Sequence, residues 1–91
     1  MYFFKTKFVK NERIEGNFIE NEAVLWDPSE GEIIRLNPVA ASIWEACDKE
    51  RTFAEIIESV QNKFEGDEKK IQKEVKHFLK KLLRQEIIKS T

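Results

Sequence analysis

A strand that runs directly into a helix constrains this chain more than any other feature of its sequence. Residues 32–36 contain two Ile and one Leu, residue types that favour strands. Asn37 follows at once and is a preferred helix N-cap, and Pro38 suits the first helical position because the N–H that it lacks would have no partner there. With no spacer between them, the strand and the helix have little freedom in how they meet. We therefore expect this strand to lie at the edge of a small sheet, with its open edge as the working surface.

The same reading predicts two strands before this one and three helices after it. The expected strands are residues 13–20, 23–27 and 32–36, and the expected helices are residues 38–48, 52–64 and 67–86. Pro28 and Gly31 mark a turn between the second and third strands. Thr52 and Glu55 form a capping box at the start of the second helix. This order predicts a small winged-helix-like α+β domain, in which a three-stranded antiparallel sheet is followed by three helices.

The two ends of the chain differ from the rest. Residues 1–12 are aromatic and basic, and we expect them to form an N-terminal arm before a single domain of residues 13–91. The arm either packs Phe4 and Phe8 on the body of the domain, or it binds a partner or exchanges a strand with a second copy. We expect residues 89–91 to be a frayed end.

The turn between the second and third strands also predicts a register. If Asp27 faces Glu32, one face of the hairpin is wholly apolar and the other is mixed, because successive side chains alternate between faces. The apolar face then holds Ala23, Leu25, Ile34 and Leu36, and the mixed face holds Val24, Trp26, Ile33 and Arg35. A slip by one residue would mix the two sets, so this division supports the register. In a three-stranded meander the middle strand is 23–27, which leaves strand 32–36 with one unpaired edge.

The last helix is expected to have an apolar stripe with a shoulder on one side only. At about 100° per residue, the stripe consists of Ile71, Val75, Phe78 and Leu82. Leu79 and Leu83 form the shoulder, and the row of lysines next to it consists of Lys76, Lys69, Lys80 and Lys73. The shoulder either lines a groove or belongs to the core. The lysine row is either a binding surface or an ordinary solvated face.

The composition and motifs do not point to catalysis. The formal net charge is −1, and the sequence has no Gly-rich phosphate loop, no nucleophile elbow and no zinc-binding His-Glu-x-x-His. His77 is the single histidine and is expected on the solvated side of its helix, whereas Cys47 is expected to be a small core residue. We therefore expect no enzyme, no cofactor and no metal. No segment is apolar enough for a membrane span or a signal peptide, so the expected protein is soluble and cytoplasmic.

The centre of the sequence resembles the signature of the PqqD-like family. The pattern consists of Gly31 with Leu36-Asn37, of Ala40 with Ile43-Trp44, of Asp48 in the following loop, and of Arg51-Thr52 with Glu55-Ile56. The resemblance covers about residues 18–88, although beyond residue 65 only helical periodicity is shared. It implies a recognition element for ribosomally made, post-translationally modified peptides, which holds the leader of a precursor peptide and presents it to a modifying enzyme such as a radical-SAM protein or a protease.

The resemblance also implies where the leader binds. In similar domains the leader adds as an antiparallel strand to the third strand and lies in a groove against the third helix, so that backbone hydrogen bonds give affinity and pockets read alternate side chains. The peptide-binding residues expected here are Ile33, Ile34, Arg35, Leu36, Gln72, Lys76, Leu79, Lys80 and Leu83. The lysine row beside the groove would suit an acidic leader. The expected partners are thus the precursor peptide and its modifying enzyme, with no membrane.

A winged-helix nucleic-acid binder is the alternative reading. Helix 67–86 would then be the reading helix and the hairpin the wing. The lysines favour this weakly, but Gln72 and Gln85 are the only candidates there for reading base edges. The hairpin is acidic and would repel phosphate, so nucleic acid is the less favoured partner. An adaptor that uses the same strand edge for a folded partner cannot be separated from the first reading by sequence.

Overall fold

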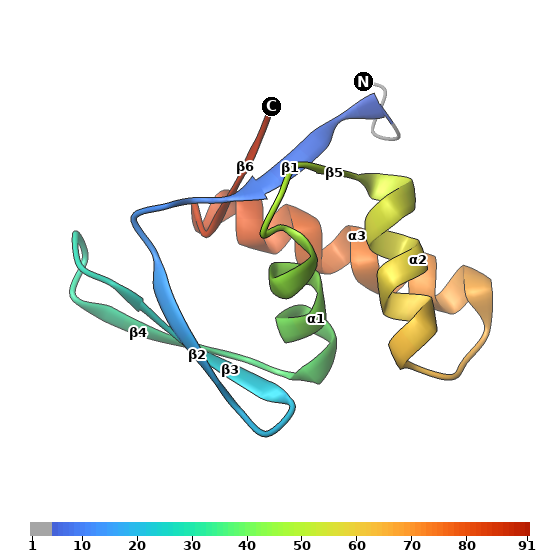
Figure 1. The fold of residues 1–91 in the computed structure, drawn as a ribbon, viewed down its shortest axis with the longest axis horizontal. Coiled ribbons are helices and arrows are strands. Elements are labelled where there is room, and N and C mark those ends of the chain that lie inside the picture. Colours follow the sequence, from blue (N-terminus) through green and yellow to red (C-terminus); the bar gives the residue numbers. More distant parts are fainter. Residues whose placement is uncertain (1–4) are drawn as a thin grey trace.

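The computed structural model describes residues 5–91, so the expected packing of Phe4 lies outside the described residues. The elements are β1 (Lys7–Lys10), β2 (Glu15–Ile19), β3 (Glu22–Asp27), β4 (Glu32–Leu36), α1 (Pro38–Ala46), β5 (Arg51–Thr52), α2 (Phe53–Lys63), α3 (Glu68–Arg84) and β6 (Ile88–Ser90). Helix α1 packs against β3 and β4, and α2 and α3 pack against α1 (Figure 1). The predicted α+β architecture, with a three-stranded antiparallel sheet and three helices, is confirmed.

The main sheet has the strand order β2-β3-β4, and its register is the predicted one. Asp27 pairs with Glu32 and Leu25 pairs with Ile34 across the hairpin. Ala23 and Leu25 are fully buried, whereas Trp26 is 41% exposed, so the two faces separate as the alternation requires. Because β3 is the middle strand, β4 has a strand partner on one side only within residues 5–91.

A second small sheet joins the two ends of the described chain. Its order is β5-β1-β6, and β1 pairs with β6 from Phe8↔Ser90 to Lys10↔Ile88. The prediction that residues 89–91 are frayed was wrong, because Lys89 and Ser90 lie in β6 and the N–H of Thr91 donates to the carbonyl of Lys7 at 2.8 Å. Phe8 is fully buried, as the first alternative for the arm expects.

Capping explains where two of the three helices begin. The side chain of Asn37 accepts a hydrogen bond from the N–H of Ala40 at 2.9 Å, so β4 passes into α1 without a loop. The predicted capping box of Thr52 and Glu55 is present in both directions at the start of α2. Helix α3 begins without such a cap, since the Asp67 side chain makes no capping hydrogen bond.

Glycine 16 allows β2 to lie close to the core. A Cβ at this position would sit 2.5 Å from Leu25 Cδ2 and 2.5 Å from Trp44 Cη2. Both side chains are buried, so neither has room to withdraw. Gly16 is therefore the residue that lets the sheet reach α1.

We predict that Gly16→Ala lowers the free energy of unfolding by about 1–3 kcal/mol, the usual cost of overpacking a core. The matched control is Gly31→Asn, because Gly31 has a φ of +66° with no atom within 4 Å of an added Cβ, and Asn tolerates this backbone region. Urea unfolding of both variants measures the difference. If Gly16→Ala and Gly31→Asn had equal free energies of unfolding, the close approach of β2 to Trp44 would be contradicted.

Candidate functional site: a groove between β4 and α3

The open edge of β4 borders a hollow whose other wall is α3. This hollow has a volume of about 210 Å³. It is lined by Ile34, Arg35, Leu36, Asn37, Ala40, Phe78, Lys81, Leu82 and Gln85. The strand therefore supplies one wall, the last turns of α3 supply the other, and the start of α1 closes the hollow between them. We call this hollow the β4–α3 groove.

The β4–α3 groove has an apolar floor and a polar mouth. Leu36, Ala40 and Leu82 are each at most 6% exposed and belong to the core. Ile34 and Phe78 are half-buried, so they present apolar surface on the two walls. At the mouth the exposed side chains are polar, and they are Arg35, Lys81 and Gln85. Such a site can hold an apolar side chain below and interact with acidic or amide groups above.

Three of the nine predicted site residues line the groove, namely Ile34, Arg35 and Leu36. Ile33 is 68% exposed and, by the pairing of β3 with β4, belongs to the opposite face of the sheet from Ile34. The expected helix positions Gln72, Lys76, Leu79, Lys80 and Leu83 do not line it.

The β4–α3 groove is bordered by a different flank of α3 from the one that the sequence predicts. Leu79 is fully buried and Leu83 packs against the core, so the alternative in which this shoulder belongs to the core is confirmed. Phe78, placed in the buried stripe by the sequence reading, is the half-buried residue that faces the groove. At about 100° per residue, Phe78, Lys81 and Gln85 share one flank of α3, whereas Lys76 lies on the other.

The residues that the sequence reading missed carried a weak signal. Phe78, Lys81 and Gln85 are spaced by three and four residues, as one flank of a helix requires. Periodicity gives the width of an apolar arc, but it does not say which border of the arc faces the sheet. Which border faces the sheet depends on the rotation of α3 about its own axis, and this rotation is set by its tertiary packing against α1.

Larger hollows lie elsewhere but do not combine these features. One of about 620 Å³ is formed at the turn between α2 and α3, and its lining includes Asn62, Glu65 and Glu68. It does not border β4, and its exposed lining side chains, which are Asn62, Lys63, Glu65 and Glu68, are all polar. We therefore take the β4–α3 groove as the candidate site, since it joins an unpaired strand edge to an apolar floor.

Comparison with known protein families gives one match. The sequence pattern of the family described as "Coenzyme PQQ synthesis protein D (PqqD)" matches residues 22–88. The chain belongs to the PqqD family. The match begins at β3 and ends at the start of β6, so it contains both walls of the groove but neither β1 nor β2.

One solved structure shows the same fold as this PqqD-family chain. It is "TbiB1 in Complex with the TbiA(beta) Leader Peptide", with a TM-score of 0.77 and 20% sequence identity. The alignment covers 88% of this chain and 93% of that chain, so the two share most of the fold. No curated protein sequence matches the chain.

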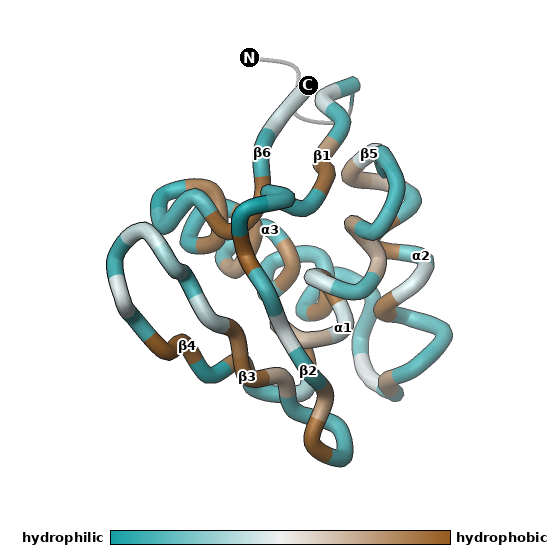
Figure 2. The backbone as a smooth tube through the Cα atoms, turned by 60° about the vertical axis from the view of Figure 1, so that its left-hand side comes forward, coloured by the Kyte–Doolittle hydropathy of each residue, from teal (hydrophilic) through white to brown (hydrophobic). Residues whose placement is uncertain are grey.

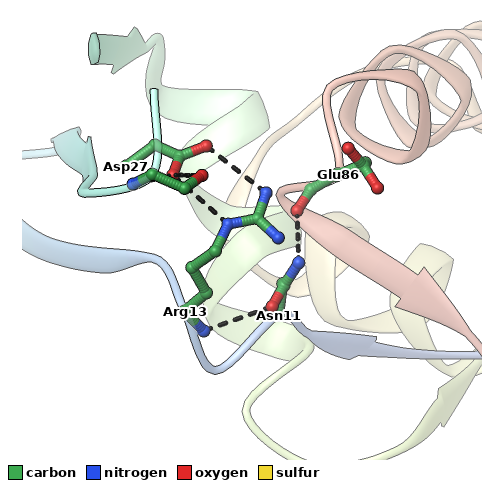
Figure 3. A network of polar contacts seen from close by, with 5 residues as sticks. Asn11, Arg13, Asp27 and Glu86 are labelled. Atoms are coloured by element: carbon green, nitrogen blue, oxygen red, sulfur yellow. Dashed lines mark hydrogen bonds and ion pairs between the residues drawn. The ribbon is translucent and has the colours of Figure 1, made fainter. Parts of the chain in front are cut away.

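A polar network holds the two walls of the PqqD-family groove at the end distant from α1 (Figure 3). The Arg13 guanidinium donates to Asp27 at 3.2 and 3.4 Å, and Asp27 is only 3% exposed. The side-chain amide of Asn11 donates to the carbonyl of Glu86 at 2.8 Å and its oxygen accepts from the N–H of Arg13. The end of β3 is thereby linked to the residues that follow α3.

The environment of Asp27 strongly favours its charged form. The hydrogen bond from Arg13, followed by those from Ser29, lowers the pKa of Asp27 from 3.8 to about 2. A carboxylate whose pKa is lower in the folded chain stabilises the fold above its unfolded pKa, and this contribution disappears as the pH falls through the folded pKa. The network is therefore intact at neutral pH.

We predict that Asp27→Asn lowers the free energy of unfolding at neutral pH, and that the difference from the parent chain shrinks as the pH falls from about 4 to about 2. Denaturant unfolding across that pH range measures it. The matched control is Glu30→Gln, an exposed carboxyl in the same turn, which should leave the pH dependence nearly unchanged. If the difference in unfolding free energy between Asp27→Asn and the parent chain did not change with pH, the stabilisation would not come from the charged Asp27 paired with Arg13.

The other chemically notable side chains do not form a site. Burial raises the pKa of Cys47 to about 12, so its thiol is protonated at neutral pH, in keeping with a small core residue. His77 is exposed and lies edge-on to Phe78. Within residues 5–91 no cluster of three metal-ligating side chains is formed, and no helix is both long and apolar enough to cross a bilayer.

Proposed function

We propose that this chain is a non-enzymatic recognition domain for the leader segment of a ribosomally made precursor peptide. The leader adds to β4 as an antiparallel strand and lies in the β4–α3 groove, and the domain presents it to a peptide-modifying enzyme. The observation that carries the proposal is the unpaired edge of β4 facing α3 across an apolar floor.

The physical case rests on what an open edge offers. An edge strand presents unpaired N–H and C=O groups, which pair readily with an added strand. The direct junction at Asn37 and the Arg13–Asp27 network hold this edge in place, so little ordering cost falls on the domain when a peptide binds. The volume of about 210 Å³ is below the range of about 300–1,000 Å³ of small-molecule pockets, and it suits a peptide side chain better.

The comparisons support the same proposal. Membership of the PqqD family and a shared fold with TbiB1, solved with a leader peptide, agree with a peptide bound to a recognition domain. The charge of α3 favours an acidic leader, because the helix carries seven Lys or Arg and two Glu between residues 68 and 84, and one of these, Lys81, lines the groove.

We predict a footprint on alternate amides of β4. The probes are synthetic peptides that span the N-terminal halves of any short open reading frames found beside the gene. In the free chain the amides of β4 that point away from β3 should exchange rapidly, and the bound peptide should protect them because it supplies their missing acceptors. Hydrogen exchange followed by NMR resolves this pattern residue by residue.

Strand β2 is the internal control for that footprint. It is the other edge of the same sheet, and its outward amides should exchange equally fast with and without peptide. Protection confined to α2, with β4 unchanged, would contradict the proposed site. Protection on β2 in place of β4 would move the peptide to the other edge.

We predict that Lys81→Glu weakens binding of an acidic leader roughly fivefold at low salt, because it reverses a charge at the mouth of the groove. Lys80→Glu is the matched control, since Lys80 is adjacent and exposed but does not line the groove. Calorimetry at two salt concentrations gives both affinities. Equal losses in the two variants would show that only the overall charge of α3 matters.

A further inference from the structure

The large exposed hydrophobic side chains of residues 5–91 all lie on one sheet. They are Phe18 (43% exposed), Ile19 (61%), Trp26 (41%) and Ile33 (68%). An antiparallel sheet with one face on the core normally turns polar side chains to water on its other face. Scattered exposed hydrophobics would need no explanation, but a set gathered on a single sheet does.

The strand register places three of these side chains together on the face that points away from α1. Trp26 pairs with Ile33 across the hairpin, and Ile19 pairs with Glu22, which is on the same face of β3 as Trp26. A hollow of about 430 Å³ on this sheet has Ile19, Val24, Trp26 and Ile33 in its lining. We call this set the outer-face patch. In Figure 2 the strands lie in front of the helices, with hydrophobic stretches along β3 and β4.

The charges around the outer-face patch are nearly all negative. By the register Glu15 and Glu22 lie on the outer face itself, Glu20 and Glu30 lie in the adjoining turns, and Glu32 lies on the opposite face; all five carboxylates are exposed. The single basic side chain in residues 15–36 is Arg35, and it pairs with Glu22 at 3.5 Å. Two copies stacked face to face would bring like charges together, which opposes self-association through this patch. The chemistry instead fits a partner with Lys and Arg around an apolar protrusion.

The outer-face patch is continuous with the proposed leader site because both use β4. Ile34 and Leu36 line the groove and Ile33 lies on the outer face, while Arg35 lies at the mouth of the groove and pairs with Glu22 of the outer face. A partner bound to the outer face would therefore contact the same strand as the leader without covering the groove. That is the geometry needed to hand a bound peptide to a second protein.

We propose that the outer-face patch is the docking surface for the peptide-modifying enzyme, which meets it with apolar side chains ringed by Lys and Arg. This inference rests on the proposed function, since it supplies the enzyme to which the leader is presented. The patch and the groove would then act as two separate binding sites on the two sides of one strand.

The test compares two variants in two binding assays. The double variant Ile19→Ser/Ile33→Ser alters only side chains that are more than 60% exposed, and Ile34→Ser alters the groove on the same strand. The probes are a synthetic leader peptide that binds the parent chain and a purified peptide-modifying enzyme that forms a complex with it. The binding of each probe to the chain is measured by calorimetry, with thermal unfolding to check that the variants are folded.

The double variant should lose about tenfold or more in affinity for the enzyme and keep its affinity for the leader within about twofold. Ile34→Ser should show the reverse, with weaker leader binding and unchanged binding of the unloaded chain to the enzyme. Enzyme affinity that is unchanged in the double variant would overturn the inference. If the parent chain is a dimer and the double variant is a monomer, the inference is also overturned, because the outer-face patch then binds a second copy of the chain.

The two proposals can fail separately. A chain that binds no leader, but whose double variant still loses the enzyme, would overturn the proposed function and support the docking surface. If the chain binds its leader at β4, but the double variant binds the enzyme as tightly as the parent does, the proposed function is supported and the docking surface is overturned.

Discussion

The direct passage of β4 into α1 is the constraint on which the candidate site depends. Leu36 is the last strand residue and is buried in the core, and Asn37 already caps the helix through the N–H of Ala40. Because no loop intervenes, the edge of β4 cannot shift without moving α1. Helix α1 in turn packs against both α2 and α3, so the position of the strand edge is set by the whole helical layer.

The far end of the hairpin is held by different forces. Asp27 closes β3 and is tied to Arg13, while Asn11 bonds to the carbonyl of Glu86 just after α3. The backbone N–H of Asn11 also donates to the carbonyl of Ile87 at 3.0 Å. The segment before β2 therefore bridges the hairpin and the end of α3. The groove is thus bounded by a covalent junction at one end and by a charged, largely buried network at the other.

Charge and hydrophobicity divide the molecule in a way that the net charge of −1 conceals. Helix α3 is basic, whereas the strands and turns of residues 15–36 carry five exposed carboxylates, one Arg and the large exposed hydrophobic side chains of residues 5–91. Strand β4 lies on the border between these regions. Its alternation gives one set of side chains to the groove and another to the outer face, so one short strand can serve two binding surfaces.

Local patterns in the sequence determined the hairpin register, the cap at Asn37, the capping box at Thr52 and the free edge of β4. Each of these follows from interactions between residues close in the chain, and a one-residue slip would have exposed Leu25 and Ile34. The family resemblance rested on the same central residues. It indicated the kind of site, but not which flank of α3 forms its wall.

Only the tertiary structure decided the rotation of α3, the pairing of β1 with β6 and the link between Arg13 and Asp27. Leu79 and Phe78 are adjacent apolar residues at the border of one stripe, and only packing against α1 and α2 buries the first and half-exposes the second. β1 and β6 are short strands about 80 residues apart in the chain, so neither carries a local signal for the other. The sequence determined what is built from neighbouring residues, and long-range contacts determined where those pieces meet.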